Sequence, residues 1–188
     1  MRSLCVFCGS SVGNHQDYAL LARQLGGCLA EAGITLVYGG GKVGLMGAVA
    51  DATLAAGGRV LGVMPEHLVK QEIAHTGLSE LHVVASMHER KEKMAALSDG
   101  FIALPGGAGT FEELFEQWTW AQLGIHEKPC ALLNAKGYFQ PLLAMIGGMV
   151  AEGFMRSAYR DMLIVSEQPA TLIELMENYL PPPPKWAK

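Results

Sequence analysis

The sequence lacks an excess of positive charge. Its 188 residues hold 14 Lys and Arg against 18 Asp and Glu, which gives a formal net charge of −4. Basic stripes are the usual footprint of proteins that bind nucleic acids, so this composition argues against a nucleic-acid partner. A phosphorylated ligand would therefore need a local positive site.

The sequence also lacks a disulfide or zinc framework. Of its four cysteines, only Cys5 and Cys8 have the Cys-x-x-Cys spacing that can mark a redox or zinc site. Both fall inside a predicted strand, which sends residues three apart to opposite faces, and a second ligand pair is missing. We interpret the cysteines as reduced, buried thiols of a cytoplasmic protein and expect neither a metal nor a cofactor.

Long apolar segments are missing as well. No apolar run approaches the roughly 20 residues that span a bilayer. The first residues show no charged region followed by an apolar stretch and a cleavage site. We expect no membrane partner, and a chain of this length, half hydrophobic with 23 glycines, to bury the core of one domain.

What the sequence does contain is an alternation of short apolar runs and longer helical patterns. Strands are predicted at Leu4–Cys8, Ile34–Tyr38, Arg59–Met64, Leu81–Ala85, Phe101–Leu104, Cys130–Leu133 and Met162–Val165. Helices are predicted at Asp17–Ala32, Leu45–Ala56, Ser86–Leu97, from Thr110 to about Gly124, at Tyr138–Glu152 and at Thr171–Leu180. This order predicts one α/β domain over residues 1–180, a doubly wound, mainly parallel, Rossmann-like sheet with helices on both faces. Pro181–Pro184 cannot continue the last helix, so residues 181–188 are predicted to be a flexible tail.

The stretch Phe101–Glu116, FIALPGGAGTFEELFE, predicts a phosphate-binding turn. An apolar run ends at Pro105, three glycines follow, and a helical pattern starts at Thr110, which forms a possible capping box with Glu113. Glycine lets a ligand approach the backbone closely, and the first amides of a helix favour an anion. The turn and helix start are therefore expected to hold a phosphate.

Two more turns follow predicted strands. Gly9-Ser10-Ser11 offers hydroxyls and amides, for which plain turn chemistry and ligand contact both stay open. Gly39–Gly44 matches G-x-G-x-x-G, but the acidic residue that an NAD fold needs is absent, because Glu66 follows Pro65 in a predicted loop. A nucleoside monophosphate is therefore favoured over NAD. All three turns lie at the carboxyl ends of strands, where such sheets bind ligands. The candidate contacts from these turns are Gly9, Ser10, Gly40 and Gly106.

Arg90 falls on the apolar stripe of its helix. Met87, Arg90, Met94 and Leu97 recur at spacings of three and four residues, and Ser86 with Glu89 forms a second possible capping box. A cation on a buried stripe needs an anionic partner. That partner is a structural carboxylate, a ligand phosphate or a catalytic carboxylate.

The order and spacing of these motifs resemble the LONELY GUY (LOG) family, the cytokinin riboside 5′-monophosphate phosphoribohydrolases. The resemblance covers nearly the whole chain. The similar segments are Cys8–Ser11, Tyr38–Gly41, Gly44–Gly47, Met87–Lys91, the P-G-G-x-G-T-x-x-E run Pro105–Glu113, and Thr119–His126.

The resemblance implies a Rossmann-like homodimer that hydrolyses nucleoside 5′-monophosphates, cytokinin ribotides and AMP, to free base and ribose 5-phosphate. It implies that Arg90 and Glu113 are the catalytic pair. The substrate contacts that it implies are Glu72, Arg90, Lys91, Gly107, Ala108, Gly109, Thr110, Phe111, Glu112, Glu113 and Thr119. Cleavage makes the ribose oxocarbenium-like, and a carboxylate near C1′ can stabilise that charge or activate water. We assign that role to Glu113, with Arg90 orienting it, the phosphate or the base.

Other interpretations stay open. A non-catalytic nucleotide-binding carrier or sensor would use the same glycine turns, and Glu113 could simply cap its helix. An NAD(P)-dependent oxidoreductase is more distant, because nothing marks a hydride-transfer site. Relatives are often labelled lysine decarboxylases, yet the sequence offers no pyridoxal-phosphate lysine site.

Overall fold

The computed structural model describes residues 1–71 and 74–185. One sheet of seven parallel strands runs through it in the order β4-β3-β2-β1-β5-β6-β7. The strands are β1 (Ser3–Phe7), β2 (Thr35–Tyr38), β3 (Val60–Pro65), β4 (Glu80–Val84), β5 (Phe101–Ala103), β6 (Cys130–Leu133) and β7 (Leu163–Ser166). β1 is central, with Cys5 beside Val37 of β2 on one side and Phe101 of β5 on the other. The predicted Rossmann-like fold class is confirmed.

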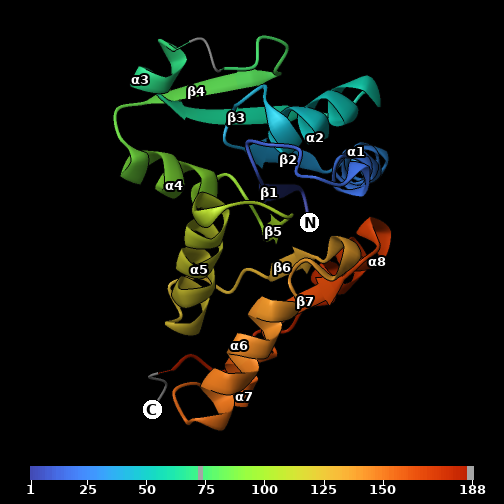
Figure 1. Ribbon diagram of the computed structural model, residues 1–188. Coiled ribbons are helices and arrows are strands. Elements are labelled where there is room, and N and C mark those ends of the chain that lie inside the picture. Colours follow the sequence, from blue (N-terminus) through green and yellow to red (C-terminus); the bar gives the residue numbers. More distant parts are fainter. Residues whose placement is uncertain (72–73, 186–188) are drawn as a thin grey trace.

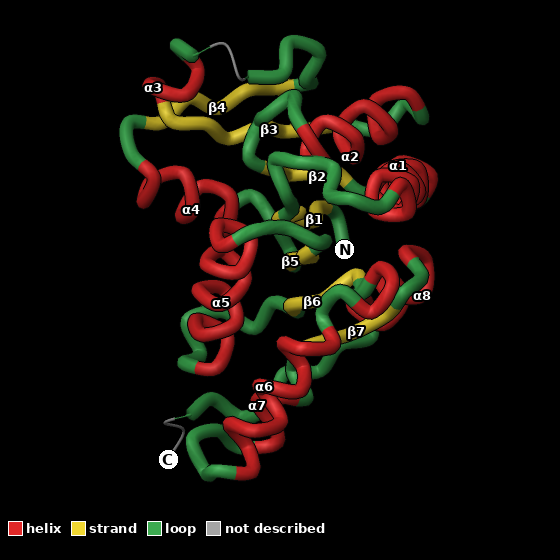
Figure 2. Tube along the Cα trace, in the orientation of Figure 1, coloured by secondary structure: helices red, strands yellow, loops and turns green. Residues whose placement is uncertain are grey.

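Helices cover both faces of the sheet (Figure 1). One face carries α1 (Gln16–Glu31), α2 (Gly44–Ala55) and α8 (Pro169–Glu177). The other face carries α4 (Met87–Ala96), α5 (Ala108–Gln122), α6 (Gln140–Ala151) and the short α7 (Ser157–Arg160). The remaining helical turns are α3 (Glu66–Val69) and the 3₁₀ turn η1 (Ala135–Gly137). Figure 2 shows how loops join these layers.

The two faces bury two separate apolar cores, and the central strands contribute to both. Val6 and Cys8 belong to the core under α1 and α2, whereas Cys5 and Phe7 belong to the core under α4 and α5. The predicted opposite orientation of Cys5 and Cys8 is confirmed. The two thiols therefore cannot form a shared redox or metal site.

The structure tests the two capping boxes that the sequence predicts at helix starts. The Ser86 half of the Ser86–Glu89 capping box is confirmed, since the Glu89 amide donates to Ser86 Oγ at 3.2 Å, but Glu89 Oε2 accepts from the Ala85 amide at 2.8 Å, one residue before the N-cap. The predicted Thr110–Glu113 box is wrong. α5 begins two residues earlier, with Gly107 as its N-cap and no side-chain cap, because the glycine turn itself winds into the helix.

The connection after β3 also differs from the prediction. Pro65 is the last residue of β3, and Glu66, predicted in a loop, begins α3. Proline fits the extended conformation before a helix start, since its φ of −65° is already fixed there. Glu66 still does not end a strand as the NAD-binding acid does.

The described part of the C-terminal segment lies against the end of α5. The Lys185 amide donates to the Gln122 carbonyl at 2.9 Å, and a Cβ added to Gly124 would fall 2.8 Å from Pro184 Cβ. This backbone bond satisfies one of the carbonyls left open at the helix end. Within residues 1–71 and 74–185, no helix is long and apolar enough to cross a membrane.

Candidate active site

The three glycine-containing turns are bonded to one another through their backbones. The Gly9 amide donates to the Pro105 carbonyl at 3.1 Å, and the Leu45 amide donates to the Gly9 carbonyl at 3.0 Å. A Cβ on Gly44 would fall 2.2 Å from the Ser10 carbonyl carbon, so the turns also touch. The ends of β1 and β5 and the start of α2 thus form one continuous surface, which we call the floor.

A cavity of about 370 Å³ opens above this floor, beside β1 and β5, and we call it the nucleotide cavity. Its lining residues are Cys8, Gly9, Ser10, Met46, Met87, Arg90, Gly107, Ala108, Gly109, Thr110, Glu112 and Glu113. Its volume lies in the range of about 300–1,000 Å³ that is usual for small-molecule sites. It sits at the carboxyl ends of the strands, where α1 and α5 leave to opposite faces, which is the topological switch point.

Arg90 enters the cavity wall with three fixed contacts. Its Nε donates to the Val63 carbonyl at 3.1 Å, and its Nη1 lies 3.4 Å from Glu113 Oε1. Its Nη2 lies directly over Gly39, where a Cβ would come within 2.1 Å. The anionic partner expected for Arg90 is therefore Glu113, and both side chains are 13% exposed.

Burial raises the pKa of the Glu113 carboxyl, and the nearby Arg90 guanidinium partly opposes that rise. The Glu113 carboxyl thus lies next to a cation but lacks full hydration. Such a group binds a proton more readily than a surface glutamate does. A carboxylate of this kind can take a proton from water or face a developing positive charge.

The start of α5 presents its backbone to the same cavity. The Gly107 carbonyl accepts the Thr110 and Phe111 amides at 3.1 and 3.3 Å, so the amides before them have no partner in the helix. A Cβ on Gly107 or Gly109 would meet no protein atom within 4 Å. Packing therefore does not require glycine at these two positions, and the open space leaves the amides accessible to an anion.

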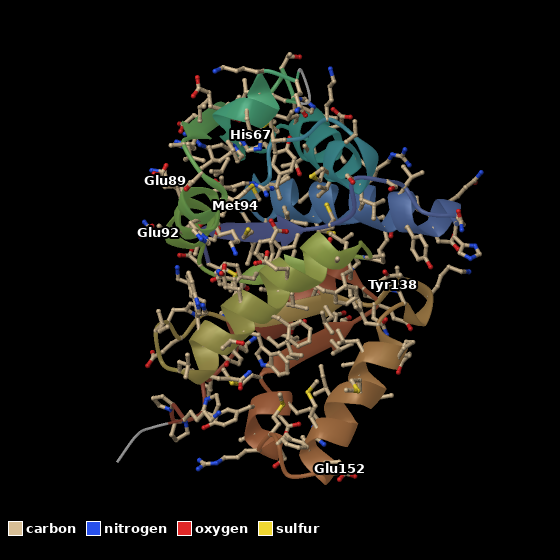
Figure 3. All side chains as sticks on the ribbon, turned by 60° about the vertical axis from the view of Figure 1, so that its left-hand side comes forward. His67, Glu89, Glu92, Met94, Tyr138 and Glu152 are labelled. Atoms are coloured by element: carbon tan, nitrogen blue, oxygen red, sulfur yellow. The ribbon has the colours of Figure 1, made fainter. Side chains whose placement is uncertain are left out.

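Lys91 is engaged by carboxylates instead of pointing into the cavity. Its Nζ lies 2.5 Å from Glu112 Oε1 and 2.9 Å from Glu116 Oε1. The hydrogen bond to Glu112 is the largest cause of the raised pKa of Lys91. The ion group ties α4 to α5 next to the Arg90–Glu113 pair. On the same helix α4, Met94 is buried against the sheet, whereas Glu89 and Glu92 face outward (Figure 3).

Four other expected contacts, Gly106, Phe111, Gly40 and Thr119, do not line the nucleotide cavity. Gly106 lines a smaller neighbouring cavity of about 240 Å³, together with Gly9, Ser10 and Gly107. Phe111 packs edge-on against Phe139. Gly40 is buried with φ +79°, and its carbonyl accepts the His75 amide at 2.9 Å. The remaining two are Thr119, exposed farther along α5, and Glu72, which lies outside the described residues.

Sequence reasoning missed part of the cavity wall. Cys8 was assigned to the strand interior and Met46 was given no role, yet both line the cavity with Met87. Burial and Glu113 raise the pKa of the Cys8 thiol, so it is a neutral wall residue. The available signal was position, since Cys8 directly precedes Gly9 and Met46 follows the second glycine turn.

Comparisons with known proteins identify similar chains. A family model described as "Possible lysine decarboxylase" matches residues 46–176. A probable cytokinin riboside 5′-monophosphate phosphoribohydrolase of Oryza sativa subsp. japonica is 50% identical over 97% of this chain and 74% of its own length. Enzymes named cytokinin riboside 5′-monophosphate phosphoribohydrolase from Arabidopsis thaliana and Rhodococcoides fascians are 47% and 52% identical. They cover 96% and 87% of this chain, and 84% and 83% of their own lengths.

Solved structures share the fold at lower identity. The molybdenum cofactor binding protein of Rippkaea orientalis superposes with a TM-score of 0.72 at 22% identity, covering 94% of this chain and 96% of that one. The molybdenum cofactor carrier protein of Chlamydomonas reinhardtii gives 0.72 at 21% identity over the same shares. At such identities the likeness concerns the fold alone.

Proposed function

Because the chain belongs to the LONELY GUY (LOG) family, with 47–52% identity to the relatives above, we propose that it hydrolyses cytokinin riboside 5′-monophosphates and AMP. The enzyme is a hydrolase of N-glycosyl bonds that releases the free base and ribose 5-phosphate. The observation that supports this most is the Arg90–Glu113 pair, 3.4 Å apart, beside the open amides of α5. A protein that only binds nucleotides does not require a poorly hydrated carboxylate beside the phosphate site.

The phosphate of the nucleotide binds at the start of α5. The open amides of Gly107, Ala108 and Gly109 and the positive end of the helix dipole lie beside the cavity, and they stabilise a dianion without a lysine. The chain has a net negative charge, so the attraction for the phosphate comes from this local site and not from the overall charge. Gly9 and Ser10 form the part of the floor on which the ribose lies.

Glu113 acts on the bond between the ribose C1′ and the base. As that bond breaks, the electron pair leaves with the base and C1′ becomes positive. The Glu113 carboxylate stabilises the cation and takes a proton from the water that attacks C1′. Arg90 stays charged throughout and orients Glu113 through its bonds to Glu113 and Val63. Glu113 then releases the proton that it took from water, and the released base takes up one proton, so the water is divided between ribose and base.

The description "Possible lysine decarboxylase" suits this chain less well. A lysine that forms a Schiff base must lose its proton, and buried amines do so when their pKa falls. Lys91, which contacts the cavity residue Glu112, has a raised pKa because Glu112 and Glu116 stabilise its charge. Its chemistry therefore favours an ion pair over covalent catalysis.

We also propose that the enzyme is a cytoplasmic homodimer. The sequence of α6 is almost wholly apolar, yet Ile146 is its only buried residue, and Met145 and Phe154 are 61% and 85% exposed. Thr119 follows Glu112 by seven residues, about 10 Å along the helix, and does not line the nucleotide cavity, so we propose that it contacts a nucleotide held by the second subunit. The four cysteines are free thiols, as in a reducing compartment.

The test is to incubate the purified protein separately with AMP and isopentenyladenosine 5′-monophosphate and to separate the products by chromatography. Free base together with ribose 5-phosphate is the expected result, and the ratio of the two rates gives the preference for the base. Tight binding of both nucleotides without cleavage would contradict the proposal and would favour a carrier.

A further inference from the structure

The peptide unit between Gly106 and Gly107 is held by a side chain from a distant part of the chain. The Tyr138 hydroxyl donates to the Gly106 carbonyl at 2.6 Å, across 32 positions of sequence. Tyr138 follows η1, in the connection between β6 and α6, and belongs to none of the motifs found in the sequence. It lines the smaller cavity beside the floor but not the nucleotide cavity.

The ring of Tyr138 is fixed by other aromatic rings. It stands edge-on to Tyr18 and Phe139, with ring centroids 6.0 and 5.1 Å apart, and it stacks on Phe111 at 6.4 Å. Such pairs stabilise a ring in one orientation. The hydroxyl therefore has one position, and it dictates where the Gly106 carbonyl points.

We propose that Tyr138 is a positioning residue that turns the Gly107 amide toward the phosphate of the nucleotide. In a planar trans peptide the carbonyl oxygen and the amide hydrogen point to opposite sides. Because Tyr138 holds the Gly106 oxygen on the side of the smaller cavity, the Gly107 N–H points away from it, and Gly107 also borders the nucleotide cavity. Within the described ranges no protein acceptor reaches that N–H.

The Gly106–Gly107 peptide needs a hydrogen bond that fixes its orientation, because both residues are glycine. A Gly-Gly peptide has few steric barriers, so rotation of the whole peptide plane is easy. The rotated peptide would turn a carbonyl oxygen toward the phosphate, and the two would repel each other. The hydrogen bond of Tyr138 opposes this rotation and keeps the anion site ready before a ligand arrives. That the anion at this site is the phosphate of a nucleotide rests on the proposed function.

The experiment compares Tyr138→Phe with Tyr18→Phe. Both variants lose one hydroxyl and keep the ring, but only Tyr138 has a hydroxyl bond to the glycine turn among the described residues. Loss of one hydrogen bond should weaken binding about three- to tenfold. For Tyr138→Phe we expect KM for AMP and the dissociation constant of ribose 5-phosphate to rise by that factor, with kcat nearly unchanged. Binding of adenosine, which has no phosphate, should not change, and Tyr18→Phe should match the wild type throughout.

Two results would overturn the role of Tyr138. One is an unchanged affinity of Tyr138→Phe for ribose 5-phosphate, and the other is an equal loss of affinity for adenosine. Calorimetry provides these affinities even if the wild type binds AMP without cleaving it, so failure of the proposed function is seen separately. A measurement without any variant uses ¹⁵N-glycine labelling, because ribose 5-phosphate should shift the Gly107 amide proton downfield. Absence of that shift would also refute the proposal.

Discussion

The guanidinium of Arg90 lies directly over the backbone of Gly39, so a Cβ at position 39 would come within 2.1 Å of Nη2. Gly39 directly follows β2, and Arg90 reaches it from α4 on the same side as Glu113. The absence of a side chain at Gly39 therefore makes room for the arginine. This changes the meaning of the G-x-G-x-x-G pattern, whose first glycine makes room for a side chain of the protein.

The first prediction concerns Gly39→Ala. The methyl group displaces the guanidinium, and a shift of about 1 Å at a reacting group lowers the rate roughly 100-fold. We expect kcat to fall by that order while KM for AMP changes little, because the phosphate site at α5 is untouched. Steady-state kinetics and a melting curve provide the check. The matched control is Gly27→Ala in α1, whose added Cβ meets no atom within 4 Å. An active Gly39→Ala enzyme would disprove the positioning of Arg90.

The second prediction concerns Glu113→Gln. The amide keeps the size of the side chain but cannot accept a proton, so kcat should drop about 10²- to 10⁴-fold. Since Glu113 does not cap α5, the affinity for AMP should stay near the wild-type value, and the melting temperature should fall only modestly, because Arg90 loses its anionic partner. Glu112→Gln is the control, because it alters the neighbouring carboxylate, which contacts Lys91, and leaves the Arg90–Glu113 pair intact. Substantial turnover by Glu113→Gln would remove Glu113 from the mechanism.

The third prediction concerns pH. The folded pKa of Glu113 is raised, chiefly by burial, so the native state holds its proton to higher pH than the unfolded chain does. Activity should therefore rise with pH through the folded pKa, above the usual glutamate range. Over the window between the unfolded and folded values, the contribution of Glu113 to stability should decrease as pH rises, because the native state binds more protons there. Paired pH profiles of kcat and of unfolding by urea test both signs.

The pH profiles have internal controls. Glu113→Gln should remove this contribution to the stability profile. In Arg90→Ala, the cation that opposes the rise of the pKa is gone, so the acid limb of any residual activity should move to still higher pH. An acid limb at the pKa of an ordinary surface glutamate in the wild type would contradict the assignment of Glu113 as the base.

The fourth prediction concerns assembly. Phe154→Asp puts a charge on the exposed apolar surface beside α6, and we expect the homodimer to dissociate. Light scattering after size exclusion should give twice the chain mass of 20.1 kDa for the wild type and one chain mass for the variant. Leu20→Asp, on the opposite face of the sheet and 52% exposed, should remain dimeric. A monomeric wild type would refute the homodimer.

Much of the fold can be predicted from the sequence, because apolar residues recur with the periods of strands and helices. Runs such as Cys130–Leu133 are apolar at every position because both faces of a parallel strand are covered, so the strand was predicted with its exact bounds. The spacing of Arg90 among methionines also indicated a partly buried cation. Both signals depend only on residues close in sequence, so they can be recognised without knowledge of the fold.

The sequence does not reveal contacts between residues that lie far apart in the chain. Tyr138 reaches Gly106 over 32 positions, and Arg90 reaches Val63 over 27, and no local pattern encodes either bond. The start of α5 was misplaced for a related reason. Thr110 and Glu113 match a capping box in spacing, but the helix already begins at Ala108, directly after the extended N-cap Gly107, and helix propensity does not predict a start at Ala-Gly.

The floor of the site consists of main-chain bonds, from Gly9 to Pro105 and from Leu45 to Gly9. Every amino acid except proline has the same main-chain groups, so substitutions at Met46 and Met87 can reshape the cavity wall without weakening phosphate binding. Affinity for the ribose phosphate and preference for the base can therefore drift apart during evolution. A single scaffold of this kind can serve a series of nucleotides that differ only in the base.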